Sequence, residues 1–178
     1  VQASANRFLG TAYDFSMYLN QDKNILAYFS ASKSNAEAMM LQYTVQDTLA
    51  TLPLSNTFIK SVAILGTGGQ YVGSGTDRLT FSKEDIQLAQ AHQGAYFWST
   101  PAGKDHPYEL QFFRLRRQPS NLANDYGYLK IGLNLEELDR ILRPSIDDGY
   151  SYYILNDRNQ VIYSIGEPDE SKLADTTA

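Results

Sequence analysis

Apolar residues near the start of the chain recur at the spacing of an amphipathic helix. The stripe consists of Ala5, Phe8, Ala12, Phe15 and Leu19. Its members stand three or four positions apart, which predicts one long N-terminal helix. Packing on a sheet is the favoured interpretation, and a helix that continues from a membrane anchor and pairs with a partner subunit is the alternative. Asp22 can cap a short second helix. Ser34 and Glu37 form a capping-box pair for a third helix, which we expect to stop at Pro53.

The middle of the chain carries the apolar and aromatic runs that are typical of strands. A hairpin is predicted over 61–75, and Ser82 with Asp85 predicts the start of a helix. Three strand-like stretches follow, over 95–100, 108–117 and 126–133. A short helix opened by Asn134 and a second hairpin over 151–165 complete the order. The order predicts an α+β fold with a five-stranded antiparallel sheet, as in PAS-like domains.

The two hairpins are copies of one pattern, ninety positions apart. The matching residues are Ser61 with Ser151, Ile64 with Ile154, Leu65 with Leu155, Gln70 with Gln160 and Ser74 with Ser164. A repeat at this spacing predicts two related modules in tandem. Residues 76–134 follow the first copy, whereas only 166–178 follow the second. We therefore expect one module over 1–133, and over 134–178 the connecting helix and first hairpin of an incomplete second module.

Composition and charge exclude several classes of function. The chain has 178 residues, a net charge of −5 and no cysteine, which excludes disulfides and thiolate metal sites. No basic run is long enough for a nucleic-acid surface. His92 and His106 are the two histidines, and neither stands at ligand spacing from paired carboxylates. We therefore expect no metal, no cofactor and no nucleic-acid partner.

The chain also lacks the motifs of the common catalytic sites. The glycines between Gly66 and Gly75 lack the Gly-Lys-Ser/Thr ending of a phosphate-binding loop, so a hairpin turn explains them better. The sequence has no Gly-x-Ser-x-Gly elbow and no Ser/His/acid arrangement. We expect this chain to have no enzymatic activity.

Four segments together resemble extracellular Cache domains. They are the long entry helix, the Asp22–Ile25 segment, the SVAIL of residues 61–65 and the GYLKIGLNLEELDRIL of residues 127–142. The sequence is most similar to the double-Cache sensors of bacterial histidine kinases of the YesM-like branch. The resemblance implies a membrane-distal PAS-like/Cache domain with a long N-terminal helix, followed by the start of a second such domain. It also implies that the chain is the extracellular part of a cell-membrane protein.

The resemblance further implies a ligand site between the sheet and the loops and helix that cover it. The aromatic and charged residues that could line it are Tyr71, Arg78, Tyr96, Trp98, Tyr108, Arg114, Asp125, Tyr126 and Tyr128. Aromatic rings can stack on sugars, and Arg78 or Arg114 can pair with a carboxylate. Core packing for Trp98 and a solvated strand edge for Arg114 are the alternatives.

Two positions bear on the class of ligand. Amino-acid-binding Cache domains carry Arg-x-Trp-Tyr and, in the last strand, an aspartate that holds the ligand ammonium. Here residues 96–99 read Tyr-Phe-Trp-Ser, and Gly132 stands in the place of the aspartate. An α-amino acid would lose its charge partners, so a carbohydrate-like ligand is favoured.

The sequence therefore predicts the signal-sensing region of a transmembrane two-component histidine kinase. Ligand binding would shift the distal domain against the long helix and so bias the kinase across the membrane. We expect a homodimer in the full-length receptor, which meets the membrane only through flanking transmembrane helices. Two alternatives stay open: the sensor of a chemotaxis receptor, and a protein-interaction module that docks an extracellular solute-binding protein.

Overall fold

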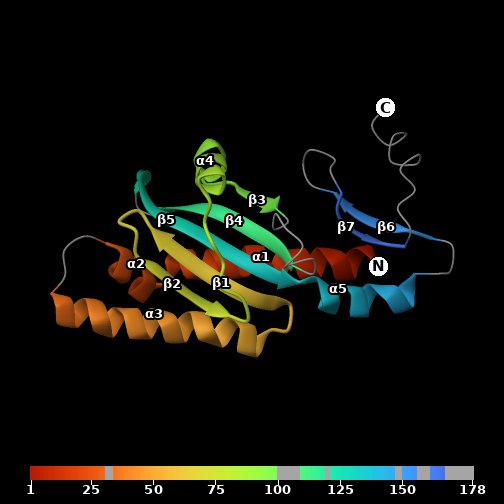
Figure 1. The fold of residues 1–178 in the computed structure, drawn as a ribbon, viewed down its shortest axis with the longest axis horizontal. Coiled ribbons are helices and arrows are strands. Elements are labelled where there is room, and N and C mark those ends of the chain that lie inside the picture. The colour runs from red at the N-terminus through yellow and green to blue at the C-terminus, as the bar shows by residue number, and fades with distance from the viewer. Residues whose placement is uncertain (31–33, 100–108, 119–120, 147–149, 156–160, 167–178) are drawn as a thin grey trace.

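The computed structural model describes residues 1–30, 34–99, 109–118, 121–146, 150–155 and 161–166 (Figure 1). The helices are α1 (Gln2–Gln21), α2 (Lys23–Phe29), α3 (Asn35–Ser55), α4 (Lys83–Ala91) and α5 (Leu135–Leu142), and a 3-10 turn follows at Arg143–Ser145. The strands are β1 (Ile59–Gly66), β2 (Tyr71–Gly75), β3 (Tyr96–Ser99), β4 (Glu109–Gln118), β5 (Asn121–Asn134), β6 (Tyr152–Leu155) and β7 (Val161–Ile165).

The strands form one large antiparallel sheet and one separate hairpin. The large sheet has five strands in the order β2-β1-β5-β4-β3, and β6 pairs with β7 alone. The α+β architecture with a five-stranded antiparallel sheet and a long N-terminal helix is thus confirmed. Both copies of the sequence repeat form hairpins, β1–β2 and β6–β7. The division into modules at residues 133 and 134 stays a prediction.

The helix starts follow the caps that the sequence supplies. The Asp22 side chain accepts hydrogen bonds from the backbone N–H groups of Asn24 and Ile25, at 2.9 and 3.0 Å. Ser34 opens α3 and Ser82 opens α4, each in a complete capping box. The expected stop at Pro53 is wrong, because α3 continues through it to its last residue. Proline has a helix-compatible φ and removes only one hydrogen bond this close to the end of the helix.

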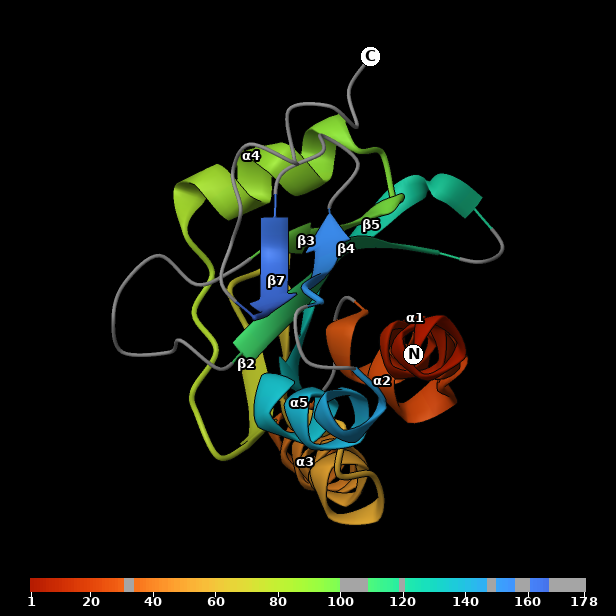
Figure 2. The same ribbon diagram turned by 90° about the vertical axis from the view of Figure 1, so that its right-hand side faces the viewer.

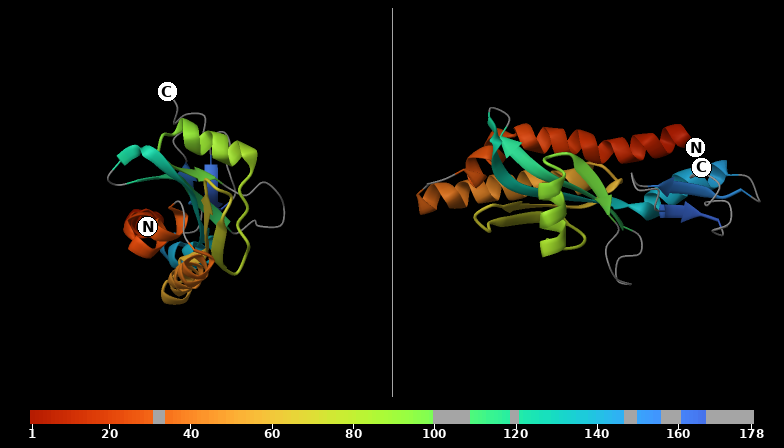
Figure 3. Two further views of the ribbon diagram at one scale, coloured as in Figure 1. Left: turned by 90° about the vertical axis from the view of Figure 1, so that its left-hand side faces the viewer. Right: turned by 90° about the horizontal axis from the view of Figure 1, so that it is seen from above.

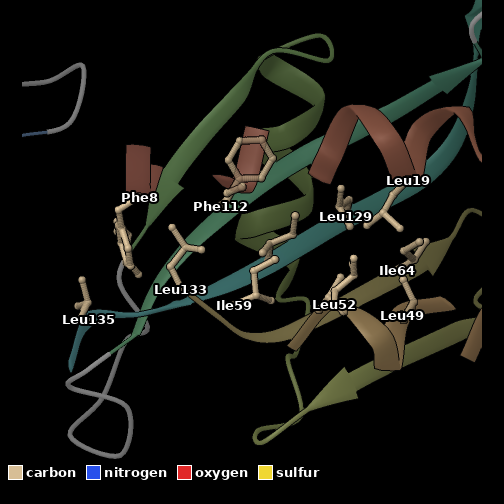
Figure 4. Close-up of a cluster of buried hydrophobic side chains, with 14 of the residues drawn as sticks. Phe8, Leu19, Leu49, Leu52, Ile59, Ile64, Phe112, Leu129, Leu133 and Leu135 are labelled. Atoms are coloured by element: carbon tan, nitrogen blue, oxygen red, sulfur yellow. The ribbon is translucent and has the colours of Figure 1, made fainter. Parts of the chain in front are cut away.

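The helices cover the large sheet unequally. Helices α1, α2 and α3 lie on one side of it and α4 lies on the other, as the end-on views show (Figures 2 and 3). The first side holds the larger core, to which β6 and β7 contribute Ile154 and Ile165. From α1 the core takes the predicted stripe, with Ala5, Phe8, Ala12 and Leu19 buried and Phe15 partly buried. Figure 4 shows ten labelled members of this core between the helices and the strands.

Alternation along the strands divides their side chains between the two sides. In β4, Phe112 belongs to the core under the three helices, whereas Phe113 belongs to the smaller core under α4. In β5, Leu129 and Ile131 face the three helices, and Tyr128 belongs to the cluster under α4. We call the sheet surface under α1–α3 the α1 face and the surface under α4 the α4 face.

Helix α3 offers a matched test of the larger core, since Leu49 is fully buried and Leu54 is 86% exposed. We expect Leu49→Ala to lower the free energy of unfolding by about 2–5 kcal/mol, because it leaves a cavity between α3 and the sheet. Leu54→Ala should change it by less than about 0.5 kcal/mol. Urea unfolding followed by circular dichroism measures both. Equal losses in the two variants would contradict this packing.

Candidate ligand-binding site

A buried lysine stands at the centre of the α4 face. Lys130 is 3% exposed and lies in β5, paired with Ala63 of β1 and Phe113 of β4. Its Nζ donates hydrogen bonds to the carbonyl oxygen of Thr80 at 2.6 Å and to the Asp85 carboxylate at 2.8 Å. The same Nζ lies 5.2 Å from the centre of the Phe113 ring. A buried ammonium needs such partners, because burying an unpaired charge is costly.

Asp85 serves both the sheet and the helix above it. Its Oδ2 accepts from Lys130 and also from the backbone N–H of Ser82 at 3.0 Å, which closes the capping box of α4. Burial acts to raise the pKa of Asp85, but the hydrogen bonds from Lys130 and Ser82 and the charge of Lys130 together lower it below its usual value. One carboxylate thereby fixes the first turn of α4 over the middle of β5.

Aromatic rings and polar groups surround this ion pair. Tyr71 donates its hydroxyl to the carbonyl oxygen of Leu79 at 3.1 Å, and the Arg78 guanidinium lies 5.0 Å from the centre of the Tyr71 ring. Burial raises the pKa of Tyr71, and Arg78 opposes that shift. On the other side of the ion pair, the Gln90 amide donates to the Tyr128 hydroxyl at 3.0 Å. The α4 face therefore presents hydroxyl, amide and cationic groups around a hydrophobic base.

Toward β1 and β2, several residues of the α4 face near Lys130 have small side chains or none. Ser61 of β1 lies between Gly75 of β2 and Gly132 of β5 in the register. Two residues further along β1, on the same face, Ala63 pairs with Gly73 of β2. A Cβ built on Gly73 would lie 2.5 Å from the Tyr71 hydroxyl oxygen. The absence of a side chain at Gly73 therefore makes room for the Tyr71 side chain to pack against the sheet. The position of the expected aspartate, Gly132, is thus on the α4 face, where it offers no charge.

The structure does not bring the nine candidate residues together. Tyr71, Arg78 and Tyr128 belong to the α4 side described above. Asp125 and Tyr126 lie in the first half of β5, where Asp125 accepts from Arg117 Nε at 3.3 Å. Tyr108 lies outside the residues that the structure describes. Of these six, Tyr71, Arg78 and Tyr128 are the ones that the structure places on the α4 face.

The other three candidates lie on the α1 face, across the sheet from Tyr71 and Tyr128. Tyr96 pairs with Arg114 and Trp98 pairs with Phe112, which places their side chains opposite to Phe113. The Tyr96 ring stacks on Phe112 at 5.0 Å and meets Tyr13 of α1 edge-on at 5.7 Å. Arg114 donates through Nε to the Gly94 carbonyl oxygen at 2.8 Å and through Nη1 to Ser16 of α1 at 3.4 Å, so it packs against α1 and is no solvated edge.

Tyr96 and Trp98 do line a groove, but with α1. The groove has a volume of about 400 Å³ and is lined by Asn6, Leu9, Gly10, Tyr13, Tyr96 and Trp98. Gly10 has nothing within 4 Å of where a Cβ would be, which keeps the groove open. Core packing, the alternative for Trp98, holds in part, because its ring contacts Phe112 at 5.3 Å.

Sequence reasoning missed the residues that organise the α4 face, above all Lys130 and Asp85. The signal was present in the segment GYLKIGL, where a lysine interrupts an otherwise apolar strand. Two further observations concern function classes. Within the described ranges no three histidine, cysteine or acidic side chains gather as a metal site would require. No helix in those ranges has the length and hydropathy of a membrane span.

The sequence matches no family model and no curated protein. The fold matches solved ligand-binding domains of bacterial chemoreceptors. The CtaA domain of Pseudomonas fluorescens, in complex with L-isoleucine, has a TM-score of 0.54 at 13% identity, over 94% of this chain and 65% of that one. The PctC domain of Pseudomonas aeruginosa, with GABA, has 0.52 at 15% identity, over 90% of this chain and 70% of that one.

A third neighbour is the PctB domain of Pseudomonas aeruginosa with L-arginine, at a TM-score of 0.52 and 16% identity, over 96% of this chain and 69% of that one. The chain has the Cache/PAS-like fold. It spans about two thirds of the length of these domains. The ligands named for them are amino acids, so the carbohydrate preference gains no support from these neighbours.

The Lys130–Asp85 ion pair makes the stability of the chain depend on pH. Because the folded-state pKa of Asp85 is lowered, its contribution is complete above the unfolded-state pKa of about 3.9 and is lost as the pH falls through the folded-state pKa. We expect Asp85→Asn to lower the free energy of unfolding at pH 7 by about 1.5–3 kcal/mol.

The difference between Asp85→Asn and the parent chain should shrink as the pH falls through the lowered folded-state pKa of Asp85, because the parent carboxylate then becomes protonated. Urea unfolding at pH 7 and at an acidic pH below that folded-state pKa measures it. Asp47→Asn on the exposed face of α3 is the control and should match the parent chain at both pH values. A pH-independent deficit in Asp85→Asn would contradict the ion pair.

Proposed function

We propose that this chain is the extracellular ligand-binding region of a transmembrane receptor and binds a small molecule on its α4 face. The observation that carries the proposal is the likeness of its fold to ligand-binding domains of chemoreceptors, with TM-scores of 0.52 to 0.54. The α4 face supports the location, since it combines aromatic rings with the hydroxyl, amide and cationic groups that orient small ligands. In this proposal the chain is a sensor without catalytic activity.

The ligand that we propose carries a carboxylate. Arg78 is exposed and, among the residues described, has no carboxylate within ion-pair distance. Its guanidinium lies against the Tyr71 ring, so an anion bound to Arg78 would also contact the Tyr71 side chain. L-isoleucine, GABA and L-arginine, the ligands named for the three neighbours, share a carboxylate.

An α-amino group is a poorer fit to this site. The Asp85 carboxylate is already engaged by Lys130 and Ser82, and Gly132 offers no charge to an ammonium. We therefore favour an organic acid, and the carbohydrate of the sequence-based prediction is the second candidate. Its support is the groove lined by Tyr96 and Trp98, whose rings could stack on a sugar.

The kind of receptor that carries this chain is assigned here by resemblance. The solved neighbours are chemoreceptors, whereas the junction and hairpin motifs of the sequence resemble histidine-kinase sensors. We propose the histidine kinase, as a homodimer held by flanking transmembrane helices, and keep the chemotaxis receptor as the alternative.

A protein partner is a further alternative with an observation of its own. Helix α3 exposes Met40, Tyr43 and Leu54, at 73%, 71% and 86%. Large exposed apolar side chains are typical of interaction surfaces, so an extracellular solute-binding protein could dock there.

A ligand panel tests the proposal directly. Melting temperatures of the chain are measured with organic acids, amino acids and sugars, each at several concentrations. We expect a saturable rise with one or more organic acids, since a ligand that binds only the folded state raises its stability. A rise with sugars alone would favour the second candidate. No rise with any compound would contradict small-molecule sensing and favour the docking alternative.

Arg78 tests the location of the site. We expect Arg78→Gln to weaken the affinity for the acid found in the panel by about 10- to 150-fold, the loss of one charge-assisted hydrogen bond. Lys23 is an exposed residue of α2, and the control variant Lys23→Gln should leave the affinity unchanged. Isothermal titration calorimetry measures both variants. Unchanged binding in Arg78→Gln would place the ligand elsewhere.

A further inference from the structure

A second buried cation lies on the opposite side of the sheet from Lys130. Arg116 of β4 is 1% exposed and is the largest fully buried side chain of the described ranges. Its Nη2 donates a long hydrogen bond, 3.3 Å, to the carbonyl oxygen of Leu19 at the end of α1. Its guanidinium carbon lies 5.7 Å from the centre of the Phe29 ring in α2. The group is therefore enclosed where α1 passes into α2.

The guanidinium is left largely without partners. Within the part of the chain that the structure describes, Arg116 Nε and Nη1 have no hydrogen-bond partner, and no carboxylate lies within 4.0 Å of the group. Lys130, by contrast, has its carboxylate at 2.8 Å. Burial lowers the pKa of Arg116 to about 10, against the opposing effects of Tyr126 and Asp22, so the group stays cationic at neutral pH. A buried positive charge with this little compensation calls for an anion.

Asn20 adds a second unpaired group at the same junction. The Oδ1 atom of Asn20 is buried and has no hydrogen-bond partner among the described residues. Asn20 directly follows Leu19, and the carbonyl oxygen of Leu19 accepts from Arg116. A side-chain amide can be turned to present its NH2 in place of its oxygen, so Asn20 offers a second donor at the junction of α1 and α2.

Two features limit the size and charge of such an anion. The full burial of Arg116 leaves no open approach for a large ligand. Asp22 acts on the guanidinium from beyond ion-pair distance, and its negative charge disfavours a divalent anion such as sulfate. Asp22 itself is engaged as the cap of α2 through Oδ1.

We propose that the junction of α1 and α2 holds a small monovalent anion of the halide class, bound to the Nε or Nη1 of Arg116 and to the amide of Asn20. The anion would neutralise the charge that α1, α2 and β4 enclose and would lock the end of α1 to the sheet. This site is separate from the α4 face and does not depend on the proposed function.

The test compares melting temperatures in sodium chloride and sodium gluconate at equal ionic strength, because gluconate is too large for an enclosed site. At a chloride concentration ten times the dissociation constant, mass action predicts a rise of about 3–6 °C for a chain of this size. Arg116→Met should abolish the difference between the two salts. Arg114→Met is the matched control, two residues away on the same face and bound to protein acceptors, and should retain it.

Equal melting temperatures of the parent chain in the two salts would overturn the proposal, and so would a chloride effect that survives in Arg116→Met. If Arg116→Met does not fold, crystals of the parent chain grown in sodium bromide decide. An anomalous peak within hydrogen-bond distance of Arg116 Nε or Nη1 supports the site. A water molecule there, without anomalous signal, overturns it.

Discussion

The ion pair between Lys130 and Asp85 is the constraint on which the α4 face depends. Helix α4 is short, and it is the one helix of the described chain that covers that face. Its first turn is held because a single carboxylate accepts from both the Ser82 backbone and the Lys130 ammonium. Neither bond can be broken without leaving a charged or polar group poorly satisfied, which is costly in a buried place. The polar contacts of Tyr71 and Gln90 are possible only while α4 and the segment before it stay there.

The two faces of the sheet have different electrostatics, although they share the same strands. On the α4 face the buried cation has a carboxylate and a carbonyl as partners. On the α1 face Arg116 has one long hydrogen bond, and the helices around it supply mostly apolar side chains. Three helices can seal an apolar core without ion pairs, because hydrophobic burial holds them in place. A single short helix buries less apolar surface, so the Lys130–Asp85 ion pair contributes a larger share of the free energy that holds α4 on the sheet.

Much of the fold was predictable because its signals are local. The stripe through Phe8 and Leu19 and the capping boxes at Ser34 and Ser82 are readable within a few residues, and all appear as predicted. The stop at Pro53 failed because the φ of proline fits a helix and its missing N–H costs α3 one hydrogen bond near the end of the helix.

The candidate site was less predictable, since it depends on register. A shift of one residue moves a strand side chain to the other face, and the sequence does not say which face α4 covers. Tyr96 and Trp98 were therefore grouped with Tyr128, from which the sheet separates them. Lys130 could be suspected from its apolar neighbours, but its partner Asp85 lies 45 positions away and becomes visible only in three dimensions.

Adjacent residues of β4, the strand next to the edge strand β3, mechanically couple the two faces of the sheet. Phe112 and Phe113 are neighbours in β4 and point to opposite faces, so a displacement of one moves the backbone that carries the other. Phe112 supports Tyr96, which touches Tyr13 of α1, and Arg114 binds α1 directly. Strand β3 has four residues and pairs on one side only, so moving it breaks fewer hydrogen bonds than moving any inner strand. A change on the α4 face would therefore reach α1 most easily through β3 and β4, where the connection between the faces is made by adjacent residues and not by a long chain of contacts.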